Sequence, residues 1–253
     1  MTTAEHRSRT RLSTGHEITL PLELSFAMGG VVVPARRSRL ETILPDTLSS
    51  LAVAPGVGCV ALVGIQYHRV GRGERDATGL EPYDEFAVIV PAVHGSRTNA
   101  PVAQLVGGEI GGYVHWLPVT TEPAVALGRE LWGYPKERAG VTVTDGPNGL
   151  RVVVTGGRYG DREAVRLEIP RPRLGPRARD WTMTSYTVED GALLGTTARI
   201  GGKVAIGIGP SVGTHLAVAP ALARELGLWH RPLARVYGSR VRARLFAGDR
   251  MTE

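Results

Sequence analysis

The stretch Glu122-Pro-Ala-Val-Ala-Leu-Gly-Arg-Glu-Leu-Trp-Gly-Tyr-Pro-Lys136 is the most informative part of this 253-residue sequence. It predicts a helix over Glu122–Trp132, because Thr121 can act as the N-cap and apolar residues recur at helical spacing. Gly133 is typical of a helix end, and the proline two residues later cannot continue a helix. Lys136 therefore stands just beyond a helix, at the start of a strand.

Lysine is rare in this sequence, which draws attention to Lys136. The chain has 30 Lys and Arg residues, and only Lys136 and Lys203 are lysines. An amine can lose its proton and attack a carbonyl group, whereas a guanidinium group stays protonated. Trp132 and Tyr134 can desolvate the amine of Lys136, as a Schiff-base lysine requires. The alternative is a lysine that complements the helix dipole, and residue spacing alone supports both interpretations equally.

The rest of the sequence predicts a mainly antiparallel β protein with a few helices. Glycine (33 residues) and proline (17 residues) are abundant, and many short segments alternate apolar and polar residues. Residues 139–144 and 150–155 predict a hairpin across an Asp-Gly-Pro-Asn-Gly turn. Further strands are expected at 163–169 and at 198–208, the latter as two strands joined by a turn at Gly201-Gly202-Lys203. Two more helices are expected, at 39–44 and 215–226.

Composition predicts one cytoplasmic domain over residues 18–253, preceded by a flexible N-terminal arm over residues 1–17. The arm is polar and lacks the apolar core of a signal peptide, and no apolar run reaches the ~18 residues of a membrane span. The single cysteine, Cys59, excludes disulfide frameworks and cysteine zinc sites. The net charge is +6, but the arginines are scattered among 24 carboxylates, so no nucleic-acid partner is expected.

Two glycine-rich patterns near residue 209 are weaker candidates for function. Residues 209–213 match G-x-S-x-G, but the acid and histidine that follow, Glu225 and His230, end a predicted helix, and no βαβ pattern supplies the sheet of a serine hydrolase. The glycines at 207, 209 and 213 are spaced one residue too widely for a dinucleotide-binding loop. The seven histidines show no metal-ligand spacing, so neither a metal nor another cofactor is expected.

These residues resemble the acetoacetate decarboxylase superfamily. The stretch that ends at Lys136 is similar to its signature, whose final lysine is the Schiff-base nucleophile. Further similarities lie at 40–45, at Tyr83-Asp-Glu85 with 88–91, at 113–115 and at 209–211. The resemblance implies a closed antiparallel β-barrel or cone with a few packed helices, and it implies a homo-oligomer.

The resemblance also implies roles for individual residues. Lys136 would be the nucleophile and Glu85 the carboxylate beside the iminium. Trp132, Tyr134 and Trp116 would shape the pocket. The candidates for substrate binding are these three aromatic residues together with His115 and Arg36.

Two departures from the family pattern bear on the substrate. Classical members follow the nucleophile with a second lysine, but here the next residue is Glu137, whose charge would favour a protonated Lys136 unless its side chain points away. The arginine that meets the substrate carboxylate in classical members falls near Phe26 or Ala27. Arg36 is the candidate replacement, with Arg37 and Arg39 as alternatives.

The sequence therefore predicts a lyase that joins Lys136 to a small keto acid as an iminium. Decarboxylation of a β-keto acid is one reading, and aldol or dehydration chemistry on a 2-oxo acid is the other, because superfamily members with such departures include aldolase and dehydratase enzymes. The opposing class is a relative that keeps the fold but uses the pocket only to bind a ligand.

Overall fold

The computed structural model describes residues 8–71, 78–95, 109–160, 162–171, 177–209, 213–229 and 231–251. The strands in chain order are β1 (Ser8–Arg11), β2 (Glu17–Leu20), β3 (Leu22–Arg36), β4 (Leu48–Ser50), β5 (Val57–Val70), β6 (Asp84–His94), β7 (Glu109–Val119), β8 (Lys136–Arg138), β9 (Gly140–Gly146), β10 (Gly149–Thr155), β11 (Glu163–Pro170), β12 (Arg177–Glu189), β13 (Ala192–Ile208), β14 (His215–Val218) and β15 (Ala234–Arg250). The helices are α1 (Arg37–Glu41), α3 (Glu122–Trp132) and α4 (Pro220–Leu226), with a 3-10 turn, η2 (Gly157–Tyr159).

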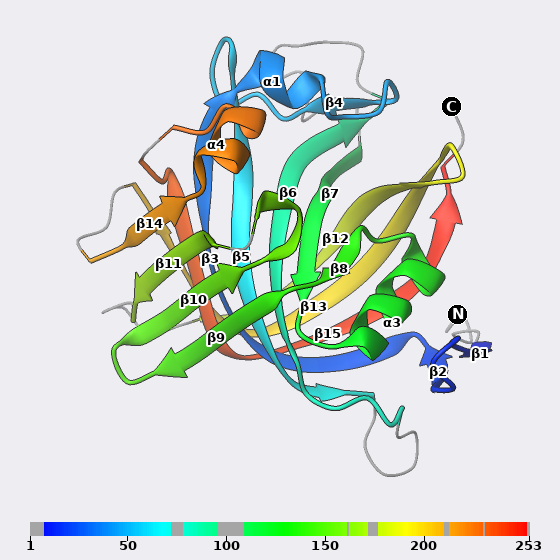
Figure 1. The fold of residues 1–253 in the computed structure, drawn as a ribbon. Helices are drawn as coiled ribbons and strands as arrows, with labels where there is room; N and C mark the ends of the chain where they lie inside the picture. Colours follow the sequence, from blue (N-terminus) through cyan, green and yellow to red (C-terminus); the bar gives the residue numbers. More distant parts are fainter. Residues whose placement is uncertain are drawn as a thin grey trace.

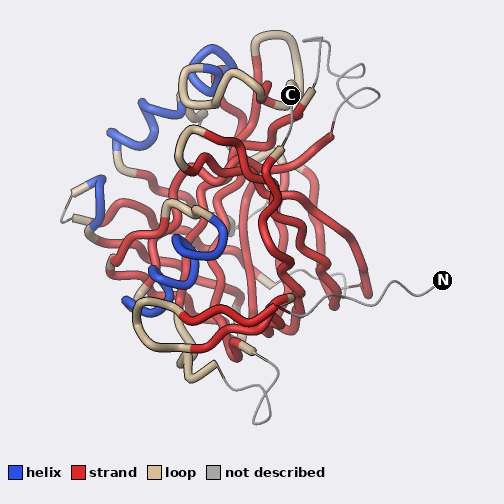
Figure 2. Tube along the Cα trace, turned by 90° about the vertical axis from the view of Figure 1, so that its right-hand side faces the viewer, coloured by secondary structure: helices blue, strands red, loops and turns tan. Residues whose placement is uncertain are grey.

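The strands form a closed barrel, as predicted (Figure 1). The large sheet runs β4-β6-β5-β3-β15-β13-β12-β7-β8, and an additional pairing of β6 with β7 closes it. The pairings are antiparallel except those of β7 with β12 and with β8, which are parallel. Figure 2 shows the helices gathered along one side of the strands. The pairing of β7 with β8 is what fixes Lys136 beside the barrel wall.

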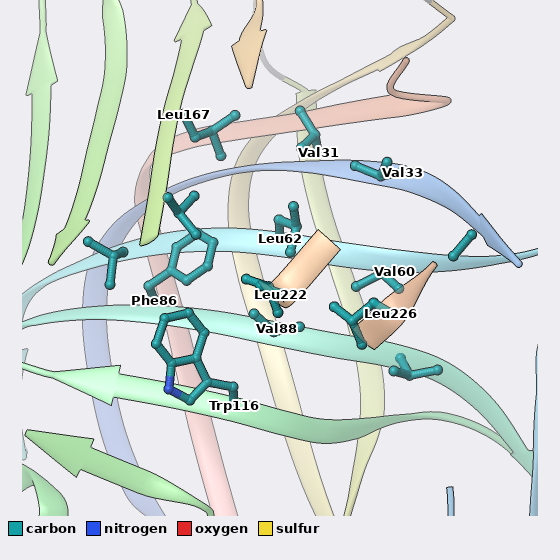
Figure 3. Packing of buried hydrophobic residues seen from close by; sticks show 14 of the residues in the cluster. Val31, Val33, Val60, Leu62, Phe86, Val88, Trp116, Leu167, Leu222 and Leu226 are labelled. Carbon is teal, nitrogen blue, oxygen red and sulfur yellow. The ribbon is translucent and has the colours of Figure 1, made fainter. Parts of the chain in front are cut away.

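A second, four-stranded sheet, β14-β11-β10-β9, packs against one face of the barrel. The layer between them is the first apolar cluster, which Figure 3 shows in part and which also receives Leu222 and Leu226 from α4. The two layers approach closely at Gly64 of β5, where a Cβ atom would collide with the side chain of Val152 in β10. A glycine at this position therefore sets the spacing of the sheets.

The other face of the barrel strands carries the second apolar cluster, which contains α3. Phe26, Tyr67 and Leu117 come from the barrel strands, whereas Leu127 and Trp132 come from the helix. The helix forms as predicted: the Thr121 side chain accepts a hydrogen bond from the backbone of the first turn, and the helix ends at a left-handed Gly133 (φ 60°). This cluster is the environment of Lys136.

The predicted hairpin and the strand after it are confirmed, whereas the predictions for residues 198–208 and 215–226 are wrong. The hairpin of β9 and β10 forms, and β11 covers the strand expected at 163–169. The two strands expected over 198–208 are one strand, β13, because β12 and β15 pair with it along its length and the glycine pair at 201–202 does not turn the chain. Lys203 lies in this strand, opposite Arg240, with a register shift just after it.

The helix expected at 215–226 is wrong in its first half. His215–Val218 forms β14, because these alternating residues find a partner in β11, and α4 begins only at Pro220, which suits a first helical position. The helix expected at 39–44 is α1, which spans Arg37–Glu41 instead.

The N-terminal prediction needs a correction as well. Residues 1–7 lie outside the described part, but β1 pairs with β2, and Leu12 between them is buried in the second apolar cluster. The backbone and hydroxyl of Ser13 both donate to Glu130 of α3. The hairpin over residues 8–20 thus contacts the rest of the fold through the buried Leu12 and these hydrogen bonds, which the expectation of a loose arm over residues 1–17 did not include.

In the described part of the chain, no helix has the length and apolar character needed to cross a lipid bilayer. Within the same residue ranges, no three His, Cys, Asp or Glu side chains come together as potential metal ligands. Both glycine-rich patterns run through residues 210–212, which lie outside the described part of the structure.

Candidate active site

The backbone holds Lys136 where helix α3 meets strand β8. The chain leaves the helix through Gly133, and Lys136 then pairs in parallel with Leu117 of β7. The guanidinium group of Arg129, on the last turn of the helix, donates to the carbonyl oxygen of Lys136 at 2.7 Å. These contacts fix the backbone of the lysine, so its side chain has a defined direction into the second apolar cluster. The residue is only 3% exposed.

The amine of Lys136 meets the carboxylate of Glu85, as expected for the predicted pair. Its Nζ lies 2.7 Å from Glu85 Oε2, and Glu85 is only 4% exposed. The amine also donates to the hydroxyl of Tyr83 at 3.2 Å and lies 5.2 Å from the centroid of that ring. The hydroxyl of Tyr67 donates to Glu85 Oε1 at 3.2 Å. The centre is thus a buried ion pair with a phenol on each side.

Neither Tyr67 nor Tyr83 was among the predicted site residues. Tyr83 precedes Glu85 by two positions, and alternation along an extended segment places both side chains on one face. That signal was present in the sequence. Tyr67 lies on β5, and its backbone N–H donates to the carbonyl oxygen of Tyr83 at 2.9 Å. Only the pairing of β5 with the segment before β6 reveals this neighbour.

The glycine at position 128 makes room for the lysine side chain. A Cβ atom added to Gly128 would lie 2.6 Å from Cε and 2.8 Å from Cγ of Lys136, and would also collide with Cδ. Real Cβ atoms do not approach other heavy atoms so closely, so the lysine or the helix would have to move. Gly128 therefore lets the aliphatic part of Lys136 lie directly against α3.

The ion pair keeps Lys136 protonated in the resting protein. Burial alone lowers the pKa of an amine, but the charge of Glu85 in contact with it, together with Tyr83, raises the pKa of Lys136 above its ordinary value. Burial raises the pKa of Tyr83 to about 12 even though Lys136 opposes the shift, so this phenol is also protonated at neutral pH. A nucleophilic amine at this position would require the proton to pass to a nearby base, and Glu85 is in contact with it.

Glu137, the unexpected neighbour of the lysine, points away from the amine. Its carboxylate accepts hydrogen bonds from the indole N–H of Trp116 and, at 3.0 Å, from the backbone N–H of Arg158. Adjacent residues of a strand face opposite sides, so Glu137 faces the first apolar cluster while Lys136 faces the second. The carboxylate that controls the amine is therefore Glu85.

Tyr134 and Trp132 lie in the second apolar cluster, on the lysine side of the wall. Their ring centroids are 5.6 Å apart. The Tyr134 hydroxyl is 2.7 Å from Ser185 Oγ, and the indole N–H of Trp132 donates to the carbonyl oxygen of Phe246 at 2.8 Å. Both polar groups thus have partners other than Lys136. These rings belong to the same apolar cluster as Tyr67 and Tyr83, and their role in substrate binding stays a prediction.

The structure does not place Trp116 and His115 beside Lys136. Trp116 belongs to the first apolar cluster and packs edge-on against Tyr159, with ring centroids 4.7 Å apart (Figure 3 shows Trp116 beside Phe86). The register of β6 and β7 shifts between Trp116 and Val114, so His115 is an extra residue in β7. Trp116 faces away from the lysine because it adjoins Leu117, the partner of Lys136, and the bulge places His115 beside Tyr159 on the side of Trp116.

Arg36 is also far from the amine. Met28 of β3 pairs with Ile65, which pairs with Glu85, so Met28 marks the level of the ion pair. Arg36 lies eight residues further along the same strand, which corresponds to about 26 Å at about 3.3 Å per residue. It is exposed beside α1 and α4, and its backbone N–H donates to Gly227. It cannot serve as the substrate carboxylate partner at Lys136.

His115 is part of a separate polar cluster that affects stability. Its Nε2 lies 2.9 Å from Glu225 and 3.4 Å from the Tyr159 hydroxyl, and Arg158 donates to its carbonyl oxygen at 2.9 Å. Burial and the charge of Arg158 lower the pKa of His115 more than Glu225 raises it. The native state therefore favours the neutral imidazole.

We expect this histidine to make the fold acid-sensitive. A group with a lowered native pKa contributes stability above its unfolded pKa, about 6.5 for histidine, and loses it as the pH falls through the native pKa. His115→Gln should therefore lose less stability than wild type between about pH 7.5 and about pH 5. Urea midpoints at the two pH values measure this, with the exposed His215→Gln as the control. Equal acid sensitivity of wild type and His115→Gln would contradict the prediction.

Comparison with known proteins gives the site its context. The family model described as acetoacetate decarboxylase matches residues 19–188. The chain is 29% identical over 99 residues to an acetoacetate decarboxylase of Burkholderia cenocepacia, covering 39% of this chain and 34% of that protein. It is 30% identical over 95 residues to acetoacetate decarboxylase 1 of Bradyrhizobium diazoefficiens, covering 38% and 32%. The matched region thus spans about a third of the length of these curated relatives.

Solved structures extend the likeness of the fold to nearly the whole chain. An acetoacetate decarboxylase of Legionella pneumophila superposes with a TM-score of 0.62 at 15% identity, covering 92% of this chain and 87% of that one. The enduracididine biosynthesis enzyme MppR, complexed with pyruvate, superposes with a TM-score of 0.63 at 14% identity, covering 98% and 99%. Because the family model matches residues 19–188, which is more than half of the chain, the chain belongs to the acetoacetate decarboxylase family.

Proposed function

We propose that this protein is a lyase that forms an iminium between Lys136 and a small keto acid, and that it decarboxylates a β-keto acid. The observation that carries the proposal is the buried contact of 2.7 Å between Lys136 Nζ and Glu85 Oε2. The curated relatives named acetoacetate decarboxylase support the reaction class. An assembly of several copies and a cytoplasmic location stay predictions.

The chemistry follows from the ion pair. When Glu85 takes the proton of the ammonium group, the free amine can attack a ketone carbon, and loss of water gives a protonated iminium. The iminium withdraws the electron pair left when CO₂ departs, which lowers the barrier to carbon–carbon cleavage. Glu85, again ionised, lies beside the positive iminium, and the surrounding apolar cluster strengthens this attraction by excluding water.

Aldol or dehydration chemistry on a 2-oxo acid is the second candidate. The observation that favours it is the similarity over 98% of this chain to an enzyme complexed with pyruvate, which is itself a 2-oxo acid. Both reactions share the iminium and differ only in which bond next to it is made or broken. Lys136 could therefore act as the nucleophile in either reaction.

Borohydride trapping tests the shared intermediate. The protein is incubated with acetoacetate or with pyruvate, reduced with borohydride, and mapped by peptide mass spectrometry. We expect a reduced adduct on Lys136 and none after Lys136→Met, because a thioether cannot form an imine. Lys203→Met removes the only other lysine, which lies exposed on β13, and should trap as well as wild type.

The products then separate the two reactions. Release of CO₂ from acetoacetate supports decarboxylation, whereas condensation of pyruvate with an added aldehyde supports the second candidate. Failure to trap any adduct with either keto acid, in a protein that is folded, would overturn the lyase proposal and favour a ligand-binding relative.

A further inference from the structure

The two phenols beside the ion pair are not equivalent. Tyr83 contacts the amine, with its hydroxyl oxygen 3.2 Å from Lys136 Nζ, whereas Tyr67 contacts the carboxylate of Glu85. Their ring centroids are 4.5 Å apart, so the rings pack against each other. Tyr67 is 8% exposed and Tyr83 is 5% exposed. All four groups of this centre are thus shielded from the solvent protons that would otherwise serve an imine-forming reaction.

The position of Tyr83 matches a requirement of imine formation. When an amine attacks a carbonyl carbon, the first product carries a positive nitrogen and a negative oxygen, and a proton must move from the nitrogen to the oxygen. The oxygen is two bonds from Nζ, so a hydroxyl that already contacts Nζ is within reach of it. A phenol can accept a hydrogen bond from nitrogen and donate its own hydrogen to oxygen at the same time.

We propose that Tyr83 is a catalytic residue that carries a proton from Lys136 Nζ to the carbonyl oxygen of the substrate while the carbinolamine forms. This inference rests on the proposed function. Glu85 first removes one proton from the ammonium group, and the amine then attacks the carbonyl carbon. The new C–N bond forms as the π pair of the carbonyl moves to oxygen. Tyr83 accepts a proton from the nitrogen and gives its own to the oxygen.

The remaining steps balance without a further reactant. The carbinolamine hydroxyl takes the proton that Glu85 holds and leaves as water, while the nitrogen lone pair forms the C=N bond. The products are the iminium, water and an ionised Glu85, and Tyr83 is again a neutral phenol. Because burial holds the pKa of Tyr83 at about 12, the group starts and ends the cycle protonated at neutral pH.

Tyr237 provides a matched control. It is also a buried tyrosine, at 4% exposure, but it belongs to the first apolar cluster, on the other side of the barrel wall. Its hydroxyl donates to the carboxylate of Asp145 at 2.7 Å. Tyr237→Phe and Tyr83→Phe each remove one tyrosine hydroxyl that donates or accepts a hydrogen bond, but only the second removes a contact to Nζ.

The test measures how fast the borohydride-trappable imine forms after mixing with acetoacetate or pyruvate. We expect Tyr83→Phe to slow imine formation by about 10²–10⁴-fold, the range for loss of a positioned proton donor, and Tyr237→Phe to leave the rate unchanged. Small buffer acids should restore part of the rate in Tyr83→Phe, because they can supply the missing proton, and a purely structural defect would not respond. Circular dichroism and urea midpoints confirm that the variants fold.

Wild-type imine formation separates this inference from the proposed function. If wild type traps an adduct and a folded Tyr83→Phe traps it at the same rate, the role of Tyr83 is wrong and the lyase proposal stands. If wild type traps nothing, both are overturned. Should Tyr83→Phe fail to fold, Tyr83→Met removes the same hydroxyl with a flexible side chain that tolerates irregular packing. We expect the same slowing of imine formation for this variant.

Discussion

Glu85→Gln is expected to lower turnover by about 10²–10⁴-fold, the range for loss of a positioned general base. The amide keeps the shape of the side chain but can neither take the proton of Lys136 nor return it when water leaves. The carboxylate lies 2.7 Å from the amine, so no other described group is as well placed to do so. Steady-state rates with the keto acid that traps on Lys136 measure the effect.

The same substitution should destabilise the fold, because it leaves a buried ammonium group without its counter-ion. Breaking a buried pair by removing one partner typically costs about 3–5 kcal/mol. Lys136 relieves part of this cost by losing its proton, since burial then lowers its pKa with only Tyr83 left to oppose the shift. Its native pKa falls below the unfolded value of about 10.4, so stability in the variant rises with pH up to that value. Wild type has a raised native pKa and shows no such rise from Lys136.

The difference in unfolding free energy between wild type and Glu85→Gln should therefore be largest near about pH 7 and shrink toward about pH 10. Urea titrations at both pH values measure it. Glu168→Gln is the matched control, because Glu168 pairs with Arg151 at 3.5 Å on the surface, where an ion pair contributes little. A pH-independent difference for Glu85→Gln would show that Lys136 is not held charged by this carboxylate.

Local signals in the sequence predicted the elements that depend on local interactions. The helix before Lys136 has its cap and its terminal glycine, and the hairpin of β9 and β10 has its turn residues, so both formed where expected. Strands β13 and β14 were misread because pairing with other strands, rather than local sequence, decides their conformation. A glycine pair suits a turn until strands on both sides hold it extended, and His215–Val218 became a strand only through β11.

The same contrast, between local signals and strand pairing, explains which site residues could be predicted. Lys136 and Glu85 could be found from the family resemblance, and alternation along one strand could have added Tyr83. Trp116 is one residue before the partner of Lys136 in β7, and only the register shows that it faces the other way. Tyr67 required knowledge of the pairing of β5, which no local pattern supplies.

Gly128→Ala is expected to have the second large effect on rate and stability, because the new methyl group contacts the side chain of Lys136 directly. The added Cβ atom would lie 2.6 Å from Cε of Lys136, so the lysine side chain or the helix must shift, and we expect this shift to disturb the contact of the amine with Glu85. A displacement of about 1 Å at a reacting group can cost about 10²-fold in rate. Overpacking of a buried site typically costs about 1–3 kcal/mol. Trapping rates and urea midpoints measure the two effects.

A double-mutant cycle isolates the contact with the lysine. In a helix, alanine is favoured over glycine by about 1 kcal/mol, so Gly128→Ala on α3 should stabilise the protein wherever nothing blocks the new methyl group. Lys136→Ala removes the Cγ, Cδ and Cε atoms that block it. We therefore expect Gly128→Ala to destabilise wild type but to stabilise Lys136→Ala, which is a reversal of sign that helix propensity alone cannot produce. The same sign in both backgrounds would mean that Gly128 is present for a reason other than the placement of Lys136.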